Sequence, residues 1–466
     1  MPSTPQQHTG ESSTDAVGPV IMVFGVTGDL SRRKILPALY HLLDQGLLPP
    51  DTKIVGISRK PLDVDELLGT VELCVLEKDK VCDPAGLARV RAALRTHQLE
   101  PDQPDDYARL RDLLDSFNGH AKRQRLFQLS IPPNAYPPII AGLSKAGLNG
   151  PRDRLLLEKP FGYDTASAEQ LIKLLAADFQ EEQIYRIDHY LAKETAQNLL
   201  AFRLHNPIFN PIWSAAHIQR VHIRLLESLD IEGRAKFYEQ TGAVRDIVQS
   251  HLLQLLSITL MDLPSDMSSQ AIHLSKEHFL EQLLPADPAE AVRGQYTGYR
   301  TEVGNPDSAV ETYALLHLQH TAERWQGTDI ILETGKALTE KIADITIEFK
   351  TPHERRRNSL TFRLQPDEGI GLDLVVKEPG LENRMRHAPL ELRYKNAFRH
   401  EQHIDAYERV LMDAIRGDQA LFASDREVLA TWQVLEPILE SWHASSKGLR
   451  FYQPGSEGPA AVTPAS

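Results

Sequence analysis

The sequence feature that most constrains the fold is an apolar run that ends in a glycine turn and continues into a helical pattern. Residues 19–24 are of β type, residues 25–30 have the sequence GVTGDL, and apolar residues with helical spacing follow between Ile35 and Leu43. Glycines allow a backbone to approach a pyrophosphate closely, and the N-terminus of the following helix faces the phosphates. The segment therefore predicts the first strand, turn and helix of a nucleotide-binding domain.

Further β-type runs at residues 53–57, 125–130 and 154–157 are separated by helical patterns. This alternation predicts a Rossmann-like, doubly wound parallel sheet, whose ligands bind at the carboxyl ends of its strands. Arg59 follows the second run, where an NAD-specific domain usually has an acidic residue. A guanidinium there suits a 2′-phosphate, so the sequence favours NADP over NAD.

The pattern changes in the second half of the chain. A long helical pattern at residues 241–261 and several β-type runs predict an α+β domain, with a large, mainly antiparallel sheet packed on helices. The runs lie at residues 218–226, 313–319, 329–332, 343–350, 359–364 and 371–376. We therefore expect a flexible tail at residues 1–18, an NADP-binding domain at 19–188, and a substrate-binding and dimerisation domain at 189–466.

Composition and charge exclude several classes of protein. Hydrophobic residues make up 41% of the chain and charged residues 25%, which is typical of a soluble globular protein. The net charge of −13 disfavours nucleic-acid partners, and no run of about 20 apolar residues predicts a membrane span. The two cysteines, Cys74 and Cys82, have neither metal-ligand nor disulfide-framework spacing, so no metal is expected. The polar N-terminus lacks a signal-peptide pattern, which indicates a cytoplasmic protein.

A polar segment with the sequence RIDHYLAKE occupies residues 186–194. Good helix formers follow it, so we expect a helix to begin near Asp188, with His189 and Lys193 one turn apart on one face. Tyr190 would lie beside them. Imidazole, phenol and ammonium donors at the positive end of a helix dipole suit a phosphate monoester.

The order of these residues resembles the signature of the glucose-6-phosphate dehydrogenase family, and the similarity runs from about residue 19 to residue 459. The resemblance implies oxidation of D-glucose 6-phosphate at C1 to 6-phospho-D-glucono-1,5-lactone, with hydride transfer to NADP. This reaction is the first step of the oxidative pentose phosphate pathway. Other matching segments are GVTGDLSRRKILPALYHL, IVGISR, IPPNAY, EKPFG, NPIFNPIW, EGRAKFYEQTGAVRDIVQSHLLQ, RGQYTGY, ERWQG, TGKALTEK, AYERVLMDAIRGDQALF and GSEGP.

The resemblance also assigns roles to residues. The general base falls on His251 and its carboxylate partner on Asp188. A neutral imidazole titrates in the right range to take the proton of the C1 hydroxyl, and the carboxylate stabilises the imidazolium that forms. The substrate residues would be Lys159, His189, Tyr190, Lys193, Glu227, Asp246, Lys336 and Lys341. The cofactor residues would be Gly25, Val26, Thr27, Gly28, Asp29, Leu30, Lys34, Arg59, Tyr136 and again Lys159.

Three residues depart from the family pattern: Ala192 replaces a glycine, Ser250 an asparagine, and His205 a small residue. They concern rate and affinity, because no reacting group is lost. Two alternatives stay open, namely an oxidoreductase for another sugar or sugar phosphate, and a catalytically weak paralogue that acts as a binding partner. Finally, the resemblance implies a homodimer formed through the large sheet, or a dimer of dimers.

Overall fold

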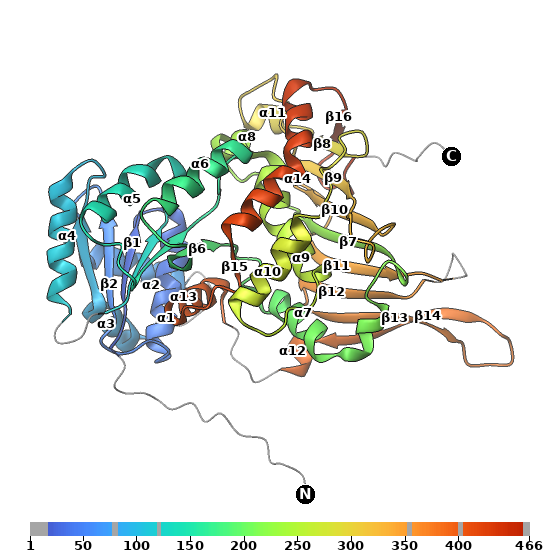
Figure 1. Ribbon diagram of the computed structural model, residues 1–466, viewed down its shortest axis with the longest axis horizontal. Coiled ribbons are helices and arrows are strands. Elements are labelled where there is room, and N and C mark those ends of the chain that lie inside the picture. The colour runs from blue at the N-terminus through green and yellow to red at the C-terminus, as the bar shows by residue number, and fades with distance from the viewer. Residues whose placement is uncertain (1–16, 77–82, 119–122, 352–356, 399–403, 460–466) are drawn as a thin grey trace, which may run out of the picture. The chain divides into compact units, whose positions relative to one another are not determined.

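Figure 1 shows the computed structural model, which describes residues 17–76, 83–118, 123–351, 357–398 and 404–459. The chain forms two compact units that interleave along the sequence, whereas the expected domains meet at a single boundary after residue 188. Most of the predicted tail lies outside the described residues, as do Cys82 and the side chain of Cys74. The first unit comprises Met1–Glu158, Asp178–Tyr185 and Leu411–Gly417, and the second comprises Lys159–Ala177, Arg186–Val410 and Asp418–Ser466.

The first unit contains the expected parallel sheet. Its strands are β1 (Val20–Phe24), β2 (Lys53–Ser58), β3 (Leu94–Gln98), β4 (Arg125–Leu129) and β5 (Asp153–Leu157), in the order β5-β4-β1-β2-β3. Its helices include α1 (Leu36–Asp44), α2 (Val64–Leu76), α3 (Pro84–Ala93), α4 (Pro104–Ser116) and α5 (Tyr136–Lys145). Because α1 to α3 pack together and α4 packs on α5, the helices form two layers, one on each face of the sheet (Figure 1).

The described residues also form short turns of other helix types. They are the π-helical turn Ser31–Ile35 before α1 and the 3-10 turns Pro133–Ala135, Glu181–Gln183 and Pro207–Ile212. Strand β1 is buried along its whole length, as its apolar sequence predicts for a central parallel strand. Strand β3 is an unpredicted element, because its sequence LRTHQ is polar and follows α3 without a turn signal.

The second unit contains a nine-stranded sheet in the order β14-β13-β12-β11-β7-β10-β9-β8-β16. It is mainly antiparallel, as expected, and only the pairs β7–β10 and β8–β16 are parallel. Strand β12 alternates buried and half-buried residues, so one face of the sheet packs on helices and the other is open. The strands are β7 (Ile218–Leu226), β8 (Val292–Tyr296), β9 (Tyr313–Leu318), β10 (Asp329–Gly335), β11 (Ile342–Phe349), β12 (Ser359–Gln365), β13 (Gly369–Lys377), β14 (Met385–Arg393) and β16 (Leu449–Tyr452).

The second unit also contains a buried helix that changes type along its length. Within the predicted helical pattern at residues 241–261, residues 241–243 end α8 (Ala235–Ala243), Val244–Leu252 form a π-helix, and α9 (Leu253–Leu260) is α-helical. The π-helix packs on β7 and β10 and on α14. The other helices and strands are β6 (Ile184–Ile187), β15 (Phe422–Ala423), α6 (Thr165–Ala176), α7 (Glu194–His205), α8 (Ala235–Ala243), α10 (Ser269–Leu280), α11 (Tyr299–Glu302), α12 (Tyr394–Ala397), α13 (Ala406–Arg416) and α14 (Asp425–Ala444).

The start of the π-helix is fixed by a close contact. Gly242 has a φ of +62°, and a Cβ at this position would lie 2.4 Å from the carboxylate of Glu311. That carboxylate accepts a hydrogen bond from the Val244 amide at 3.0 Å and so satisfies one of the unpaired amides of the first turn. Within the described part of the chain, we find no helix with both the length and the apolar character that a membrane span requires.

Candidate active site

The centre of the candidate site is the imidazole of His251, near the C-terminal end of the π-helix. Its Nδ1 lies 2.6 Å from Oδ1 of Asp188, and the two side chains are only 1% and 2% exposed. Because an ionised carboxylate only accepts hydrogen bonds, we assign the proton to Nδ1 of His251, which leaves a lone pair on Nε2. A general base needs this tautomer.

The backbone around Asp188 holds the carboxylate in place. Asp188 directly follows β6, whose residues Arg186 and Ile187 pair with β15. The Tyr190 amide donates to Oδ1 of Asp188 at 2.9 Å, the same oxygen that His251 contacts. The carboxylate that orients His251 is therefore itself anchored by a strand pair and a turn.

Lys159 contacts the free nitrogen of the base. Its Nζ lies 2.7 Å from Nε2 of His251, and it also donates to the backbone oxygen of Asp246 at 2.7 Å and to Oγ of Ser250 at 3.2 Å. Its distance to the Asp246 carboxylate is 3.5 Å. A substrate hydroxyl that approaches Nε2 would take the place of the ammonium, and Asp246 and Ser250 would retain Lys159 beside it.

Burial and neighbouring charges set the protonation of this cluster. Burial lowers the pKa of His251; Asp188 raises it and Lys159 lowers it, and the resulting pKa is below the ordinary value. Burial alone would raise the pKa of Asp188, but His251, Lys159 and His189 bring it well below its usual range. Around neutral pH the site therefore holds a neutral imidazole against an ionised carboxylate.

The expected helix start at Asp188 is wrong. Helix α7 begins at Glu194, and the residues before it form turns closed by bonds from the Leu191 amide to the Asp188 carbonyl (3.1 Å) and from the Lys193 amide to the Tyr190 carbonyl (3.2 Å). Since the Asp188 side chain accepts from a nearby backbone amide, it stabilises a turn in place of a helix. His189 and Lys193 therefore do not share a helix face.

The three phosphate-binding candidates nevertheless lie together. The Nζ of Lys193 lies 3.9 Å from the centre of the Tyr190 ring, and the ring centres of His189 and Tyr190 are 4.9 Å apart. Those two rings lie 4.7 and 4.4 Å from the ring of His251. Lys193 is also the N-cap of α7, so the positive end of the helix dipole adds to this cationic surface.

The candidates for the sugar hydroxyls divide into two groups. Glu227 and Lys336 form an ion pair at the ends of the parallel neighbours β7 and β10, and Asp246 pairs with Lys159. Burial alone would raise the pKa of Asp246, but Lys159 and Lys336 lower it, so this carboxylate is ionised. Lys341 is exposed, and no described ion pair or hydrogen bond connects its side chain to the other candidates.

In the first unit, a cavity of about 480 Å³ lies beyond the carboxyl ends of β1 and β2. Gly25, Thr27, Gly28 and Arg59 line it, together with residues of the loop that follows β4. Gly25 has a φ of +70°, and a Cβ there would lie 2.3 Å from the Ser130 carbonyl oxygen. These glycines leave a wall of bare backbone, and the exposed Arg59 supplies a cation, so the residues present fit a dinucleotide with a 2′-phosphate.

Other predicted cofactor residues lie around this cavity in different ways. Val26 is buried, Asp29 pairs with Arg33 at 2.9 Å, and Leu30 is half-buried. Lys34 is exposed on the π-helical turn and is not part of the cavity wall. The fully buried Tyr136 donates to the Glu158 carbonyl at 2.9 Å, so it supports the end of β5.

Sequence reasoning missed several residues of these sites. Ser58, Ile131 and Asn134 line the cavity, and the rule that ligands bind beyond strand ends would have selected them. Ser250 was noted only as a departure, but its spacing of four from Asp246 places both on one helical face, next to Lys159.

Two further features bear on the chemistry. Asp188, His189 and His251 each place one possible ligand atom within 4.8 Å of the others, which is compact enough for a metal ion. The Lys159 ammonium already occupies Nε2 of His251, and its charge would repel a metal cation, so the arrangement favours acid–base chemistry.

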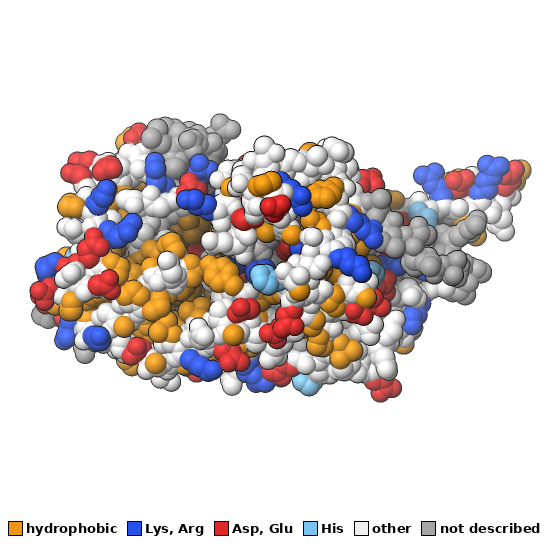
Figure 2. Space-filling view, turned by 90° about the horizontal axis from the view of Figure 1, so that it is seen from above, with side chains coloured by type: hydrophobic (Ala, Val, Ile, Leu, Met, Phe, Trp, Pro, Cys, Tyr) orange, Lys and Arg blue, Asp and Glu red, His pale blue; other side chains and the backbone are white. Residues whose placement is uncertain are grey.

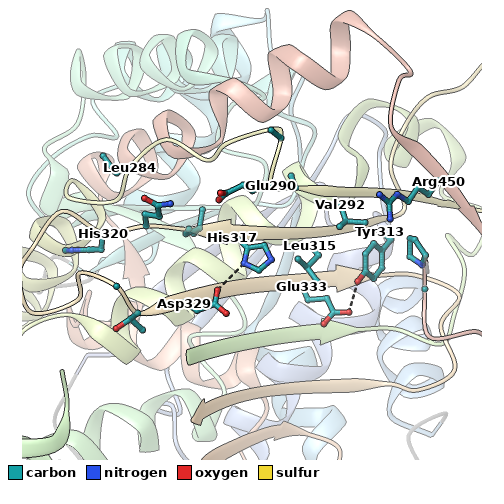
Figure 3. Close-up of a pocket in the computed structure, with 18 of the residues that line it drawn as sticks. Leu284, Glu290, Val292, Tyr313, Leu315, His317, His320, Asp329, Glu333 and Arg450 are labelled. Carbon is teal, nitrogen blue, oxygen red and sulfur yellow. Dashed lines mark hydrogen bonds and ion pairs between the residues drawn. The ribbon is translucent and has the colours of Figure 1, made fainter. Parts of the chain in front are cut away.

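A larger cavity, of about 1410 Å³, lies on the open face of β8 to β10, and no candidate site residue lines it (Figure 3).

Comparison with known proteins agrees with the geometry. The protein-family model described as "Glucose-6-phosphate dehydrogenase, NAD binding domain" matches residues 22–198. The family model described as "Glucose-6-phosphate dehydrogenase, C-terminal domain" matches residues 200–465. The glucose-6-phosphate 1-dehydrogenase of Mycolicibacterium smegmatis is 37% identical and aligns over 94% of each chain. That of Chlamydia muridarum is 36% identical over 91% of this chain and 90% of its own.

Solved structures give the same result. A glucose-6-phosphate dehydrogenase in complex with its substrate glucose-6-phosphate superposes with a TM-score of 0.90 at 31% identity, over 95% of this chain and 96% of that one. The glucose-6-phosphate 1-dehydrogenase of Mycobacterium avium superposes with a TM-score of 0.84 at 30% identity, over 95% of each chain. This chain belongs to the glucose-6-phosphate dehydrogenase family.

Proposed function

We propose that this protein oxidises D-glucose 6-phosphate at C1 to 6-phospho-D-glucono-1,5-lactone and transfers the hydride to NADP. The observation that carries the proposal is the buried His251 imidazole, which has Asp188 on one nitrogen and Lys159 on the other. The family membership of the whole chain supports the same reaction. We further infer that the protein acts in the cytoplasm.

In the proposed mechanism, the C1 hydroxyl of the sugar donates a hydrogen bond to Nε2 of His251, which removes the proton as the C1–H bond breaks. NADP, when bound, supplies the acceptor for the hydride. The Asp188 carboxylate stabilises the imidazolium through Nδ1, and it stays ionised because its neighbours hold its pKa well below the usual range. Lys159 withdraws toward Asp246 and Ser250 when the hydroxyl arrives, and its ammonium then stabilises the developing negative charge on the oxygen.

Substrate selection follows from the charges in the second unit. We assign the phosphate to His189, Tyr190 and Lys193, which lie beside the base and can each donate a hydrogen bond to an anion. Glu227, Asp246 and Lys336 would bind the sugar hydroxyls. Buried charged groups that lose their partners are costly, so sugars that lack these hydroxyls or the phosphate are poor substrates.

The first unit is proposed to bind NADP. The bare backbone at Gly25 and Gly28 accommodates the pyrophosphate, and Arg59 binds the 2′-phosphate. An enzyme for another sugar phosphate is the second candidate, because the phosphate donors alone do not distinguish the hexose.

One experiment separates these possibilities. The purified protein is mixed with NADP or NAD and with glucose 6-phosphate, glucose, galactose 6-phosphate or mannose 6-phosphate, and formation of the reduced nicotinamide is followed by absorbance. We expect the highest kcat/KM with glucose 6-phosphate and NADP. Faster reduction with another hexose phosphate would favour the second candidate, and no reduction with any of them would indicate a non-catalytic paralogue.

We also propose that the protein is a homodimer formed through the large sheet. Strand β14 lies at the edge of the sheet and exposes apolar side chains, including Leu390 (60% exposed) and Leu392 (44%). Exposed apolar side chains on an edge strand are a liability unless another chain covers them. The tip of the β13–β14 hairpin, at the right of Figure 2, carries ion pairs such as Glu382–Arg384.

Sedimentation equilibrium tests this part of the proposal. Wild type is expected to be dimeric, or a dimer of dimers, and Leu390→Glu to be monomeric. The change Leu274→Glu is a control on α10, where the side chain is similarly exposed at 54%. A monomeric wild type would overturn the dimer.

A further inference from the structure

We propose that the C-terminal segment Tyr452–Ser456 positions Lys336 in the substrate site, and that the Tyr452 hydroxyl is the contact that does so. The inference rests on the proposed function, because it takes Lys336 to be a substrate-binding lysine. It adds a positioning residue from the end of the chain, more than 100 positions away in the sequence. Tyr452 is the last residue of β16, which pairs with β8.

The backbone that carries Lys336 is in an unusual conformation. The next residue, Ala337, has a φ of +52°, and it is one of three described non-glycine residues with positive φ. A left-handed conformation is unfavourable for an alanine, so the surrounding contacts must hold it in place. Strain of this kind is concentrated at active sites and ligand-binding positions.

One side of this turn is held by the loop after β7. The Ala337 amide donates to the Leu229 carbonyl at 2.8 Å, and the Leu338 amide donates to the Glu227 carbonyl at 2.9 Å. The side chain of Glu227 also pairs with the Lys336 ammonium. These contacts connect the turn to its partner in the candidate site.

The other side is held by the C-terminal segment through three hydrogen bonds. The Tyr452 hydroxyl donates to the Lys336 carbonyl at 2.7 Å, and the Gly455 amide donates to the Ala337 carbonyl at 2.7 Å. The Thr339 amide donates to the Ser456 carbonyl at 2.8 Å. Two of the three bonds use backbone groups only, so the hydroxyl of Tyr452 is the one contribution that depends on a particular side chain.

The surroundings of Tyr452 hold its hydroxyl in position against the backbone of Lys336. The side chain is buried (4% exposed), and its oxygen also lies 2.9 Å from Oγ1 of Thr312. The Thr312 carbonyl accepts from the Lys336 amide at 2.9 Å, so Tyr452 and Thr312 together bind both backbone polar groups of Lys336. The Lys336 ammonium lies 5.7 Å from the ring centre of the buried Tyr238, and this fixes the other end of the lysine.

The outer side of this assembly borders the cavity in Figure 3. Tyr313 directly follows Thr312, and its hydroxyl donates to Glu333 at 2.8 Å on the cavity wall, which Gly458 and Pro459 also line. The chain on both sides of the C-terminal segment, at Arg450 and at Glu457 to Pro459, therefore borders this cavity. Loss of the Tyr452 hydroxyl removes a buried hydrogen bond and allows the turn to relax toward an unstrained φ, which moves the ammonium.

The test is a double-mutant cycle on glucose 6-phosphate binding, measured by titration calorimetry with the full-length protein. Tyr452→Phe should weaken binding about 5–10-fold, the value of one neutral hydrogen bond, and should leave NADP binding unchanged. In a Lys336→Met background, the same change should have no further effect, because Tyr452 acts through Lys336. The matched control is Tyr296→Phe, which removes the hydroxyl of another buried tyrosine; that hydroxyl donates to Glu302, and no described hydrogen bond joins it to the turn.

A second variant guards against misfolding. Gly455→Ala places a Cβ where no atom lies within 4 Å, but it opposes the φ of +78° and so loosens the bond to Ala337 without a clash. It should weaken glucose 6-phosphate binding in the same direction as Tyr452→Phe. Three outcomes would overturn this inference and leave the proposed function intact. They are equal losses from Tyr296→Phe and Tyr452→Phe, unchanged affinity in both Tyr452→Phe and Gly455→Ala, and a full Tyr452→Phe effect in the Lys336→Met background. A wild type that does not bind glucose 6-phosphate would overturn the proposed function with it.

Discussion

The change Asp188→Asn tests how the base is activated. In the wild type, the carboxylate and the imidazolium formed during the reaction are in contact, with 2.6 Å between Oδ1 and Nδ1. If the charge centres are about 4 Å apart and the effective dielectric constant is about 20, their attraction is about 4 kcal/mol. Both groups are buried, so solvent does not screen this energy. At about 1.4 kcal/mol per tenfold change in rate, kcat should fall about 10³-fold.

The pH dependence of the variant provides an independent check. Asp188 raises the pKa of His251 against the effects of burial and of Lys159. Its removal therefore lowers this pKa, and the acid limb of kcat/KM, where the base becomes protonated, should move to lower pH. Steady-state rates across a pH series measure both effects, and titration calorimetry measures substrate affinity, which should change little.

A matched control is available in the same unit. His317 and Asp329 form a second pair, with 3.1 Å between Nδ1 and Oδ1, on the wall of the cavity in Figure 3. Asp329→Asn removes the same kind of contact outside the candidate site and should leave kcat unchanged. The reasoning would be refuted if Asp188→Asn kept kcat within about tenfold of wild type, or if its loss appeared only in substrate affinity.

Three further predictions follow. Lys193→Met should raise the KM for glucose 6-phosphate about 10–100-fold through loss of a charge-assisted contact, with little change in the KM for glucose. The control Lys173→Met, at an exposed lysine, should change neither KM. Equal effects of Lys193→Met on both sugars would contradict the phosphate assignment. Arg59→Gln should reduce kcat/KM for NADP about 10–100-fold and leave that for NAD nearly unchanged; an equal loss for both cofactors would exclude a 2′-phosphate contact. Gly25→Ala and Gly46→Ala both oppose a positive φ, but only Gly25→Ala places a Cβ in a clash. Thermal unfolding should therefore show a larger loss of stability for Gly25→Ala than for Gly46→Ala, and NADP titration should show a loss of binding for Gly25→Ala alone.

The sequence predicts those elements whose residues carry their own signal. Strand β1 and its glycine turn are evident because a fully buried parallel strand is a continuous apolar run and because the turn needs a residue with positive φ. The alternation in β7 and β12 is evident because one face of each strand is buried. Strand β14 is missed because its residues are almost all exposed, so no burial pattern distinguishes it from a loop.

The candidate site is less accessible to such reasoning. His251 lies in an apolar helix, where most histidines are structural, and its partner Asp188 lies 63 positions earlier in the chain. No spacing rule connects them, so only the resemblance to a family identifies the pair. The local geometry at Asp188 was also mispredicted, because a side-chain bond to the Tyr190 amide outweighs the helix propensity of the residues that follow.

The same limit applies to the turn at Lys336. Its conformation depends on the loop after β7 and on the C-terminal segment, neither of which is near it in sequence. Contacts between distant segments determine where this lysine points, and no local pattern encodes them.

The most direct test of the account is the kcat of His251→Asn, measured together with its affinity for glucose 6-phosphate. The asparagine retains a polar group beside Asp188 and Lys159 but cannot act as a base, and His317→Asn is the control for loss of a histidine elsewhere. We predict that kcat falls about 10²–10⁴-fold, the usual contribution of a general base, and that substrate affinity is nearly unchanged. A variant that kept most of the wild-type kcat would contradict the assignment of His251 as the base.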